Sequence, residues 1–370
     1  MNQSVYCSMI HGGLELSLKD QEPTAQHCCL RLSRFPIDIQ TNFWNDPKFN
    51  PLRKINQKNN WDPGCENCKN IESTGNTSFR LGMNDGLVVP DNPTGPARID
   101  LMFDISCNLA CRTCSPKYST FWQKHLKDNN QWDQPVFAPR HYDEIITALE
   151  QLDLSNLQML VFCGGETLLG QTHWDVVRWL VDNVPNAKQQ LTICFQTNGT
   201  QPIHPRNHAL IDQVKLVKLH ISLDGVGSRF EYLRWPASWN QVTDNIMQLK
   251  ATAPSNVMFL VEETISTYNL FYINELESWV KKNFTTNREG DIVNHTRHLA
   301  FGIQQLANCT QEYVDAMQSS VHQTLIPSNW KEDPEQIHQL VANIKQFDQI
   351  RNQSFQHTFP EVAEFYARYW

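Results

Sequence analysis

Short apolar segments alternate with amphipathic segments through the middle of the chain. The apolar segments predict strands at 97–105, 157–163, 190–197, 217–224, 256–264 and 298–305. Helical spacing of apolar residues predicts helices at 117–128, 141–153, 172–184, 205–214, 238–252 and 269–283. Strands that alternate with helices form parallel sheets, because each return to the starting edge needs a crossover. We therefore expect an α/β fold, as an open sheet or an incomplete barrel.

The two ends of the chain follow other patterns. Residues 1–92 are rich in turn-forming Pro, Gly, Asn and Asp and predict a loop-rich module. Residues 309–370 are mostly of helical pattern, and their apolar positions predict a face packed on the core. We expect three parts: 1–92, the strand–helix region 93–308, and a helical C-terminal extension at 309–370.

Composition narrows the classes of function. A net charge of -8 argues against a broad basic surface for nucleic acid. The first residues lack the pattern of a signal peptide, and no apolar run is long enough for a membrane span, so we expect a cytoplasmic protein without membrane contact. In that compartment eleven cysteines indicate metal or redox chemistry more than disulfides.

Three of these cysteines, Cys107, Cys111 and Cys114, follow the first predicted strand within eight positions. Three thiolates on one loop suit a [4Fe–4S] cluster held at three corners, with the fourth iron open to another ligand. The alternative is a structural zinc site with a distant fourth ligand.

The next three predicted strands also end in polar or glycine-rich sequences. These are "GGET" at 164–167, "TNGT" at 197–200 and "SLDG" at 222–225. Because the carboxyl ends of parallel strands share one rim, the four loops are predicted to converge on one site.

The cysteine trio, the GGE sequence and the SLDG sequence together resemble the radical S-adenosylmethionine (SAM) superfamily, over residues 97 to about 305. The resemblance implies a partial (β/α)6 TIM-like barrel. It also implies that SAM binds the open iron and is reductively cleaved to a 5′-deoxyadenosyl radical, which abstracts a substrate hydrogen. A reductant such as flavodoxin or ferredoxin would supply the electron.

The same resemblance implies roles for six further residues. Two glycines would let the backbone approach the methionine ammonium group of SAM, and a glutamate would accept its hydrogen bond. A serine and an aspartate would lie near the ribose, and an arginine would bind the SAM carboxylate. The glycines are Gly164 and Gly165, and the glutamate is Glu166. The serine and the aspartate are Ser222 and Asp224, and the arginine is Arg234.

The N-terminal region contains a second set of cysteines. Cys65 and Cys68 can chelate one metal, and Cys7 with one of Cys28 or Cys29 would complete four thiolates for zinc or an iron–sulfur cluster. The set resembles twitch or SPASM-type auxiliary modules, here before the barrel. This implies an auxiliary [4Fe–4S] cluster held by Cys7, Cys28, Cys65 and Cys68, with Cys28 chosen over Cys29. Glu72, Gly75, Ser78 and Arg80 belong to the same resemblance.

The net reaction stays open at this stage. Relatives with auxiliary modules suggest oxidative modification or cross-linking of a peptide. Epimerisation, or modification of a nucleotide, sugar or other small molecule, is the alternative. Cys309 is a candidate hydrogen donor to a substrate radical or an incidental loop thiol. A hypothesis of another class is a non-catalytic zinc-binding interaction module.

Overall fold

The computed structural model describes residues 4–31, 33–73, 75, 77–284, 295–300, 304–317 and 330–370. Within these residues nine strands form one sheet, in the order β3-β2-β1-β4-β5-β6-β7-β8-β9. Strand β1 and strands β4 to β9 run parallel to one another, and β2 and β3 add an antiparallel edge next to β1. Their bounds are β1 Gly13–Ser17, β2 Thr24–Gln26, β3 Phe35–Pro36, β4 Arg98–Met102, β5 Met159–Phe162, β6 Thr192–Thr197, β7 Leu216–Ser222, β8 Val257–Ile265 and β9 His295–Leu299.

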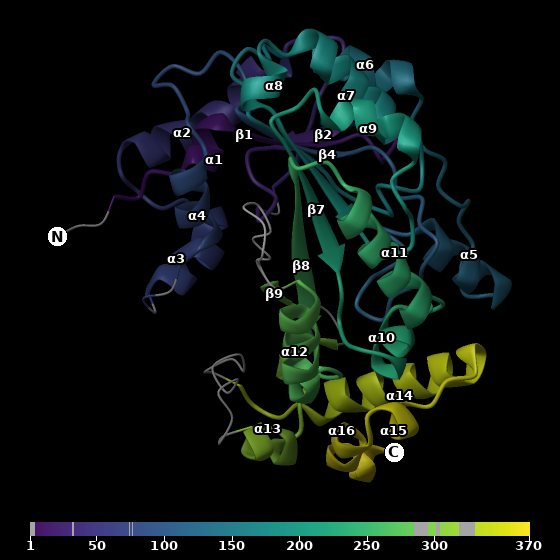
Figure 1. The fold of residues 1–370 in the computed structure, drawn as a ribbon. Coiled ribbons are helices and arrows are strands. Elements are labelled where there is room, and N and C mark those ends of the chain that lie inside the picture. Colours follow the sequence, from purple (N-terminus) through teal and green to yellow (C-terminus); the bar gives the residue numbers. More distant parts are fainter. Residues whose placement is uncertain are drawn as a thin grey trace.

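The helices fall into three groups along the chain (Figure 1). The N-terminal group is α1 Ser8–Gly12, α2 Asn50–Gln57, α3 Glu66–Ser73 and α4 Phe79–Gly86. The crossover group is α5 Thr120–Asp128, α6 Tyr142–Glu150, α7 Thr172–Asn183, α8 Ala187–Gln190, α9 His208–Ile211, α10 Ser228–Leu233, α11 Trp239–Thr252 and α12 Ile273–Asn283. The C-terminal group is α13 Gln311–Met317, α14 Pro334–Arg351, α15 Phe355–Thr358 and α16 Pro360–Phe365.

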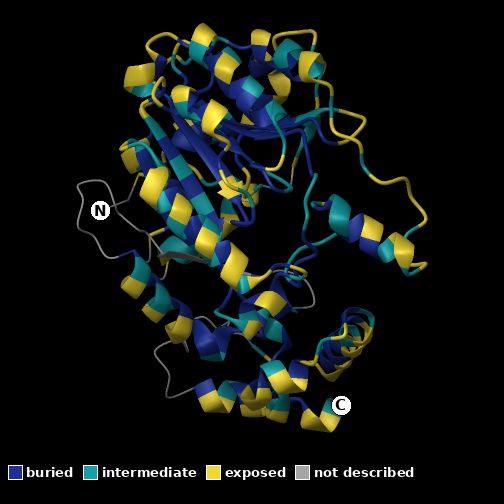
Figure 2. Ribbon diagram, turned by 45° about the vertical axis from the view of Figure 1, so that its right-hand side comes forward, coloured by how far each residue is buried: buried dark blue, intermediate teal, exposed yellow. Residues whose placement is uncertain are grey.

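The two faces of the sheet differ in polarity. Alternate residues such as Ile99, Leu101 and Phe162 belong to the main apolar core, together with Trp174 and Ile246 of the crossover helices. Strand residues that alternate with the core positions, including Asp100 of β4 and Gln196 of β6, line a cavity on the other face. Period-two alternation places successive side chains on opposite faces. Figure 2 shows the strands as largely buried and the helices as banded with exposed positions.

The parallel sheet with crossover helices is confirmed, and each predicted strand corresponds to one of β4 to β9. The last differs in position: β9 begins at His295, three residues before the predicted start, and residues 301–303 lie outside the described part of the chain.

The N-terminal region, predicted to be loop-rich, also contributes strands to the main sheet. Strand β1 pairs in parallel with β4, from Gly13 opposite Arg98 to Ser17 opposite Met102. Its alternating Leu14 and Leu16 are fully buried in the main core, which explains why the segment joins the sheet. The N-terminal region is therefore joined to the sheet by a strand.

The helical pattern predicted for the C-terminal extension is confirmed in α13 to α16, which gather at one end of the molecule in Figure 1. Their apolar side chains form a second core with residues after β8, including Tyr268, Ile337 and Phe359. Among the described helices we find none with the length and hydropathy that a membrane crossing requires.

Candidate active site

A cavity of about 830 Å³ lies at the carboxyl ends of the parallel strands, on the polar face of the sheet. Loops after four different strands contribute to it, as the positions of the sequence motifs predict. The residues of the predicted SAM site that line this cavity are Cys107, Cys111, Cys114, Gly164, Gly165, Ser222 and Arg234. The structure thus brings together seven of the nine predicted residues of the SAM site.

The cysteine loop after β4 is held by hydrogen bonds on both sides. Arg112 N donates to Leu233 O at 2.7 Å, and Ala110 N donates to Trp235 O at 2.8 Å. The indole Nε1 of Trp122, in α5, donates to Cys111 O at 2.9 Å. The loop therefore presents its three thiols from a backbone that neighbouring elements fix in place.

The two glycines of the GGE sequence are required by a close backbone contact. Gly164 and Gly165 have φ of +87° and +57°. A Cβ on Gly165 would lie 2.4 Å from Ser106 O, and one on Gly164 would lie 2.8 Å from Asp104 O. Only glycine combines that conformation with that approach. The glycine loop packs directly against the start of the cysteine loop.

Side-chain N–H groups point at two of the three sulfur atoms. Asn198 Nδ2 lies 3.9 Å from Cys107 Sγ, and Arg234 Nη1 lies 4.0 Å from Cys111 Sγ. Hydrogen bonds to sulfur tune the potential of iron–sulfur clusters. Burial raises the pKa of Cys107 to about 11 and also raises that of Cys114, so metal binding must displace protons from these thiols. Three thiols, two N–H donors and a cavity fit a cluster held at three corners.

Glu166 and Asp224 are buried behind the cavity wall and do not line it. Glu166 accepts hydrogen bonds from Asn198 N at 2.6 Å, Thr197 Oγ1 at 2.7 Å and Leu168 N at 3.0 Å. It therefore fastens the glycine loop to the end of β6, and its contact with the SAM ammonium group stays a prediction.

Asp224 has a similar structural role after β7. Its Oδ1 accepts a hydrogen bond from Thr264 N at 2.9 Å, and its Oδ2 lies 3.0 Å from Arg234 Nε. This ion pair orients Arg234, whose side chain is 9% exposed. Asp224 thus positions the arginine in the cavity wall, and a direct contact with ribose stays a prediction.

Cys309 lies outside the cavity. It is fully buried in the second core, beside Tyr313 and Tyr366. Burial raises the pKa of its thiol far above the usual range. The structure therefore does not bring this candidate hydrogen donor to the predicted site.

The four predicted auxiliary cysteines line a second, small cavity of about 30 Å³ in the N-terminal region. Cys7, Cys28, Cys65 and Cys68 all face it. Burial, with smaller contributions from the nearby Cys65 and Cys68, raises the pKa of Cys7 to about 11. Arg31 Nη1 lies 4.0 Å from Cys65 Sγ. Among the described residues, no group of three or more Cys, His, Asp or Glu is arranged to hold a single metal ion.

The cysteine doublet is divided between the two cavities. Cys28 is 9% exposed and lines the N-terminal cavity, whereas its neighbour Cys29 is exposed and lines the large cavity. This placement supports the choice of Cys28 for the auxiliary set.

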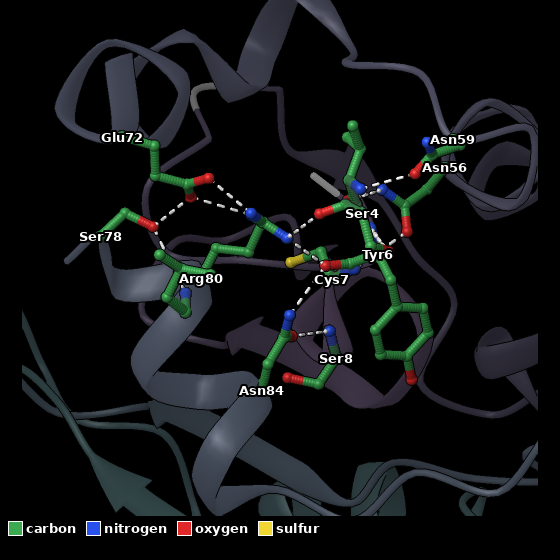
Figure 3. A network of polar contacts seen from close by, with 12 residues as sticks. Ser4, Tyr6, Cys7, Ser8, Asn56, Asn59, Glu72, Ser78, Arg80 and Asn84 are labelled. Atoms are coloured by element: carbon green, nitrogen blue, oxygen red, sulfur yellow. Dashed lines mark hydrogen bonds and ion pairs between the residues drawn. The ribbon is translucent and has the colours of Figure 1, made fainter. Parts of the chain in front are cut away.

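The segment that carries Cys7 is held by side chains of α2 and α4 (Figure 3). Arg80 Nη1 donates to Tyr6 O at 2.5 Å and to Ser4 O at 3.2 Å. The same guanidinium pairs with Glu72 at 2.5 Å, and Asn56 Oδ1 accepts from Cys7 N at 3.1 Å. Ser78 Oγ also donates to Glu72. Three of the four residues in the Glu72–Arg80 motif therefore form an anchor for a predicted metal ligand.

Several cavity residues were not predicted from the sequence. Asn198 was recognised only as part of a turn, although its position after β6 places it on the rim. Others were not predicted to line this cavity, because they reach it from the N-terminal region, from strand interiors or from the position directly after β5: Glu15, Cys29, Arg34, Asp100, Gln196 and Cys163.

No family model and no curated protein sequence matches this chain. Among solved structures, anSMEcpe with bound AdoMet is similar with a TM-score of 0.42 and 16% identity. That match covers 69% of this chain and 62% of the anSMEcpe chain. Streptococcus suis SuiB bound to S-adenosylmethionine matches with a TM-score of 0.40 and 11% identity, over 94% of this chain and 74% of SuiB. SuiB bound to the precursor peptide SuiA gives a TM-score of 0.36 and 10% identity over 96% and 75%.

Proposed function

We propose that this chain is a radical SAM enzyme whose reaction takes place in the large cavity. The observation that carries the proposal is the convergence on one cavity of residues from three parts of the sheet edge: Cys107, Cys111 and Cys114 after β4, the Gly164–Gly165 turn after β5, and Ser222 and Arg234 at and beyond the end of β7. The cysteines would hold a [4Fe–4S] cluster, which with SAM supplies one-electron cleavage to a 5′-deoxyadenosyl radical.

The residues of the chain have distinct tasks in this proposal. The glycine turn offers backbone at close range, because neither glycine has a side chain to separate a ligand from it. Arg234 would bind the SAM carboxylate, and Asp224 fixes its guanidinium. Asn198 orients Cys107, and Glu166 fastens the glycine turn to β6.

We further propose an auxiliary [4Fe–4S] cluster on Cys7, Cys28, Cys65 and Cys68, in a module of residues 1–92 before a partial barrel of residues 93–308. Four protein ligands leave no open iron, so this centre suits electron transfer. The polar inner face of the sheet would receive the substrate. Oxidative modification or cross-linking of a peptide is the proposed net reaction, with a flavodoxin or ferredoxin as reductant.

Iron analysis of protein purified without oxygen tests this proposal. We expect a brown protein with about eight irons per chain, from two four-iron clusters. Replacement of Cys107, Cys111 and Cys114 by Ala should leave about four irons and abolish 5′-deoxyadenosine formation with dithionite. Replacement of Cys65 and Cys68 should also leave about four irons but preserve part of the SAM cleavage.

Two results would contradict the proposal. A colourless protein with stoichiometric zinc would favour the zinc-binding interaction module. Continued formation of 5′-deoxyadenosine without the Cys107 trio would show that these residues do not hold the cluster that cleaves SAM.

A further inference from the structure

The inner end of the large cavity contains two carboxylates on neighbouring strands. Glu15 of β1 stands opposite Asp100 of β4 in the parallel register, and both line the cavity. Arg34, Cys29 and Cys163 line the cavity with them. None of these residues takes part in the predicted SAM site.

Three of the four carboxylate oxygens at this end are occupied by the protein itself. Glu15 Oε1 pairs with Arg34, and Glu15 Oε2 accepts a hydrogen bond from Gln26. Asp100 Oδ1 accepts from Arg98 Nε at 2.7 Å. These contacts come from the same part of the sheet, so the cavity end is a built polar site.

The fourth oxygen, Asp100 Oδ2, is buried and has no hydrogen-bond partner among the described residues. Asp100 is 1% exposed and its side chain lies in the cavity wall. A buried carboxylate oxygen without a donor is costly, and a charged donor is its best partner. This oxygen can therefore accept a hydrogen bond from a donor that enters the cavity.

The single free oxygen limits the kind of donor. A guanidinium group binds a carboxylate best through two parallel hydrogen bonds, which need both oxygens. Here Arg98 already occupies Oδ1, so a second guanidinium lacks half of its acceptor. A primary ammonium group is a compact cation that can donate to one oxygen.

We propose that Asp100 Oδ2 binds a primary ammonium group of the substrate at the inner end of the large cavity. The inference rests on the proposed function, because it names a chemical group of the substrate of that site. Cys29 and Cys163 beside the carboxylate would contact the alkyl part of the same group, since cysteine behaves as a small apolar side chain.

Binding of pentylamine tests this inference, with pentanol as the neutral analogue of the same length. Saturation-transfer NMR on the full chain, purified without oxygen, would measure both affinities. We expect pentylamine to bind roughly tenfold more tightly, as one charge-assisted hydrogen bond allows. Equal affinities of the amine and the alcohol would overturn the inference, and this comparison needs only the wild-type protein.

Variants locate the binding site. Asp100→Asn should remove the preference for the amine, and Met102→Lys should block it with a tethered ammonium from the next cavity-lining position of β4. Glu275→Gln, on the exposed Arg229 ion pair, should leave the preference unchanged. An Asp100→Asn protein that is folded and still prefers the amine would overturn the inference.

Two further measurements separate this site from the SAM site. Pentylamine should bind equally well with and without S-adenosylhomocysteine, and competition between them would overturn the inference, because it would place the amine in the proposed SAM site. Absence of SAM cleavage together with a retained preference for the amine would contradict the proposed function and leave the ammonium site standing.

Discussion

At the scale of single residues, Gly165 shows why the GGE sequence at 164–166 needs glycine. Its positive φ and the nearness of Ser106 O leave no room for a side chain. The contact joins the loop after β5 to the loop that carries the cysteines. Glycine is therefore required at position 165 by a steric contact within the protein itself, whether or not a cofactor is bound.

Gly165→Ala should lower the free energy of unfolding by about 2 kcal/mol or more, because a Cβ adds both strain and a backbone clash. It should also reduce the iron held by the Cys107 trio. Gly82→Ala is the matched control: Gly82 lies in α4, and a Cβ there meets no atom within 4 Å. That variant should be neutral or slightly stabilising. Equal effects of the two variants in thermal unfolding would contradict this account.

At the scale of elements, α4 has a task beyond packing. Arg80 and Glu72 form an ion pair whose side chains are 4% and 7% exposed, and Arg80 also binds the backbone before Cys7. Removal of one partner of a buried pair leaves an uncompensated charge. The pair therefore links the stability of the module to the position of a predicted ligand.

Arg80→Met should cost about 3 kcal/mol of stability and release the segment that carries Cys7. We expect loss of the metal bound at the N-terminal cavity, measured per chain, with the iron of the Cys107 trio retained. Lys281→Met removes an exposed pair with Glu277 and should change stability by less than about 1 kcal/mol. Full metal content in the Arg80→Met protein would show that the anchor does not position Cys7.

A second link between elements crosses strands β7 and β8. His220 Nδ1 lies 2.5 Å from Glu262 Oε1. Burial opposes the charge on His220, but Cys194 and Glu262 outweigh it and raise its pKa to about 9. Burial likewise opposes the charge on Glu262, but His220 and His298 lower its pKa to about 2. Both groups are thus charged near neutral pH.

The pH dependence of stability follows from these pKa values. A raised histidine pKa stabilises the fold fully below 6.5, the ordinary pKa of histidine, and the contribution is lost as pH rises through about 9. His220→Gln should therefore cost on the order of 2 kcal/mol near pH 6, and its difference from wild type should shrink toward pH 9. Denaturant unfolding across this range measures it, with exposed His357→Gln as control. A difference that grows with pH would contradict the assignment.

At the scale of the whole molecule, the C-terminal helices reach back to the cysteine loop. Asp348 of α14 accepts hydrogen bonds from Arg112 at 2.7 Å, Tyr232 at 2.7 Å and Phe355 N at 2.6 Å. The Arg112 side chain is 1% exposed and lies between two ligands of the trio. The C-terminal helices therefore stabilise the predicted cluster loop from outside the parallel sheet.

Asp348→Asn should destabilise the protein by about 3 kcal/mol, because the buried Arg112 loses its carboxylate. Iron held by the trio should then be lost several-fold faster to a chelator, which is followed by the decay of cluster absorbance. Glu335→Gln, at the exposed start of the same helix, should change stability by no more than about 0.5 kcal/mol. Unchanged iron loss in Asp348→Asn would limit α14 to a packing role.

The parallel alternation of strands and helices and the convergence of the four loops could be predicted from the sequence alone. Both depend on local information: the alternation of strand and helix patterns, and the rule that parallel strands end at one edge. The spacing of Cys107, Cys111 and Cys114 is equally local. The positions of β4 to β8 accordingly agree with the predicted ranges to within a few residues.

Only the tertiary structure decided which side chains enter the cavity. It joined β1 to β4, turned Cys28 and Cys29 toward different cavities, and placed Glu166 and Asp224 behind the wall. These features depend on contacts between residues far apart in the chain, where packing and burial select one orientation among several that the local sequence allows. The free oxygen of Asp100 belongs to the same class, because its burial and its partner both arise from the assembled sheet.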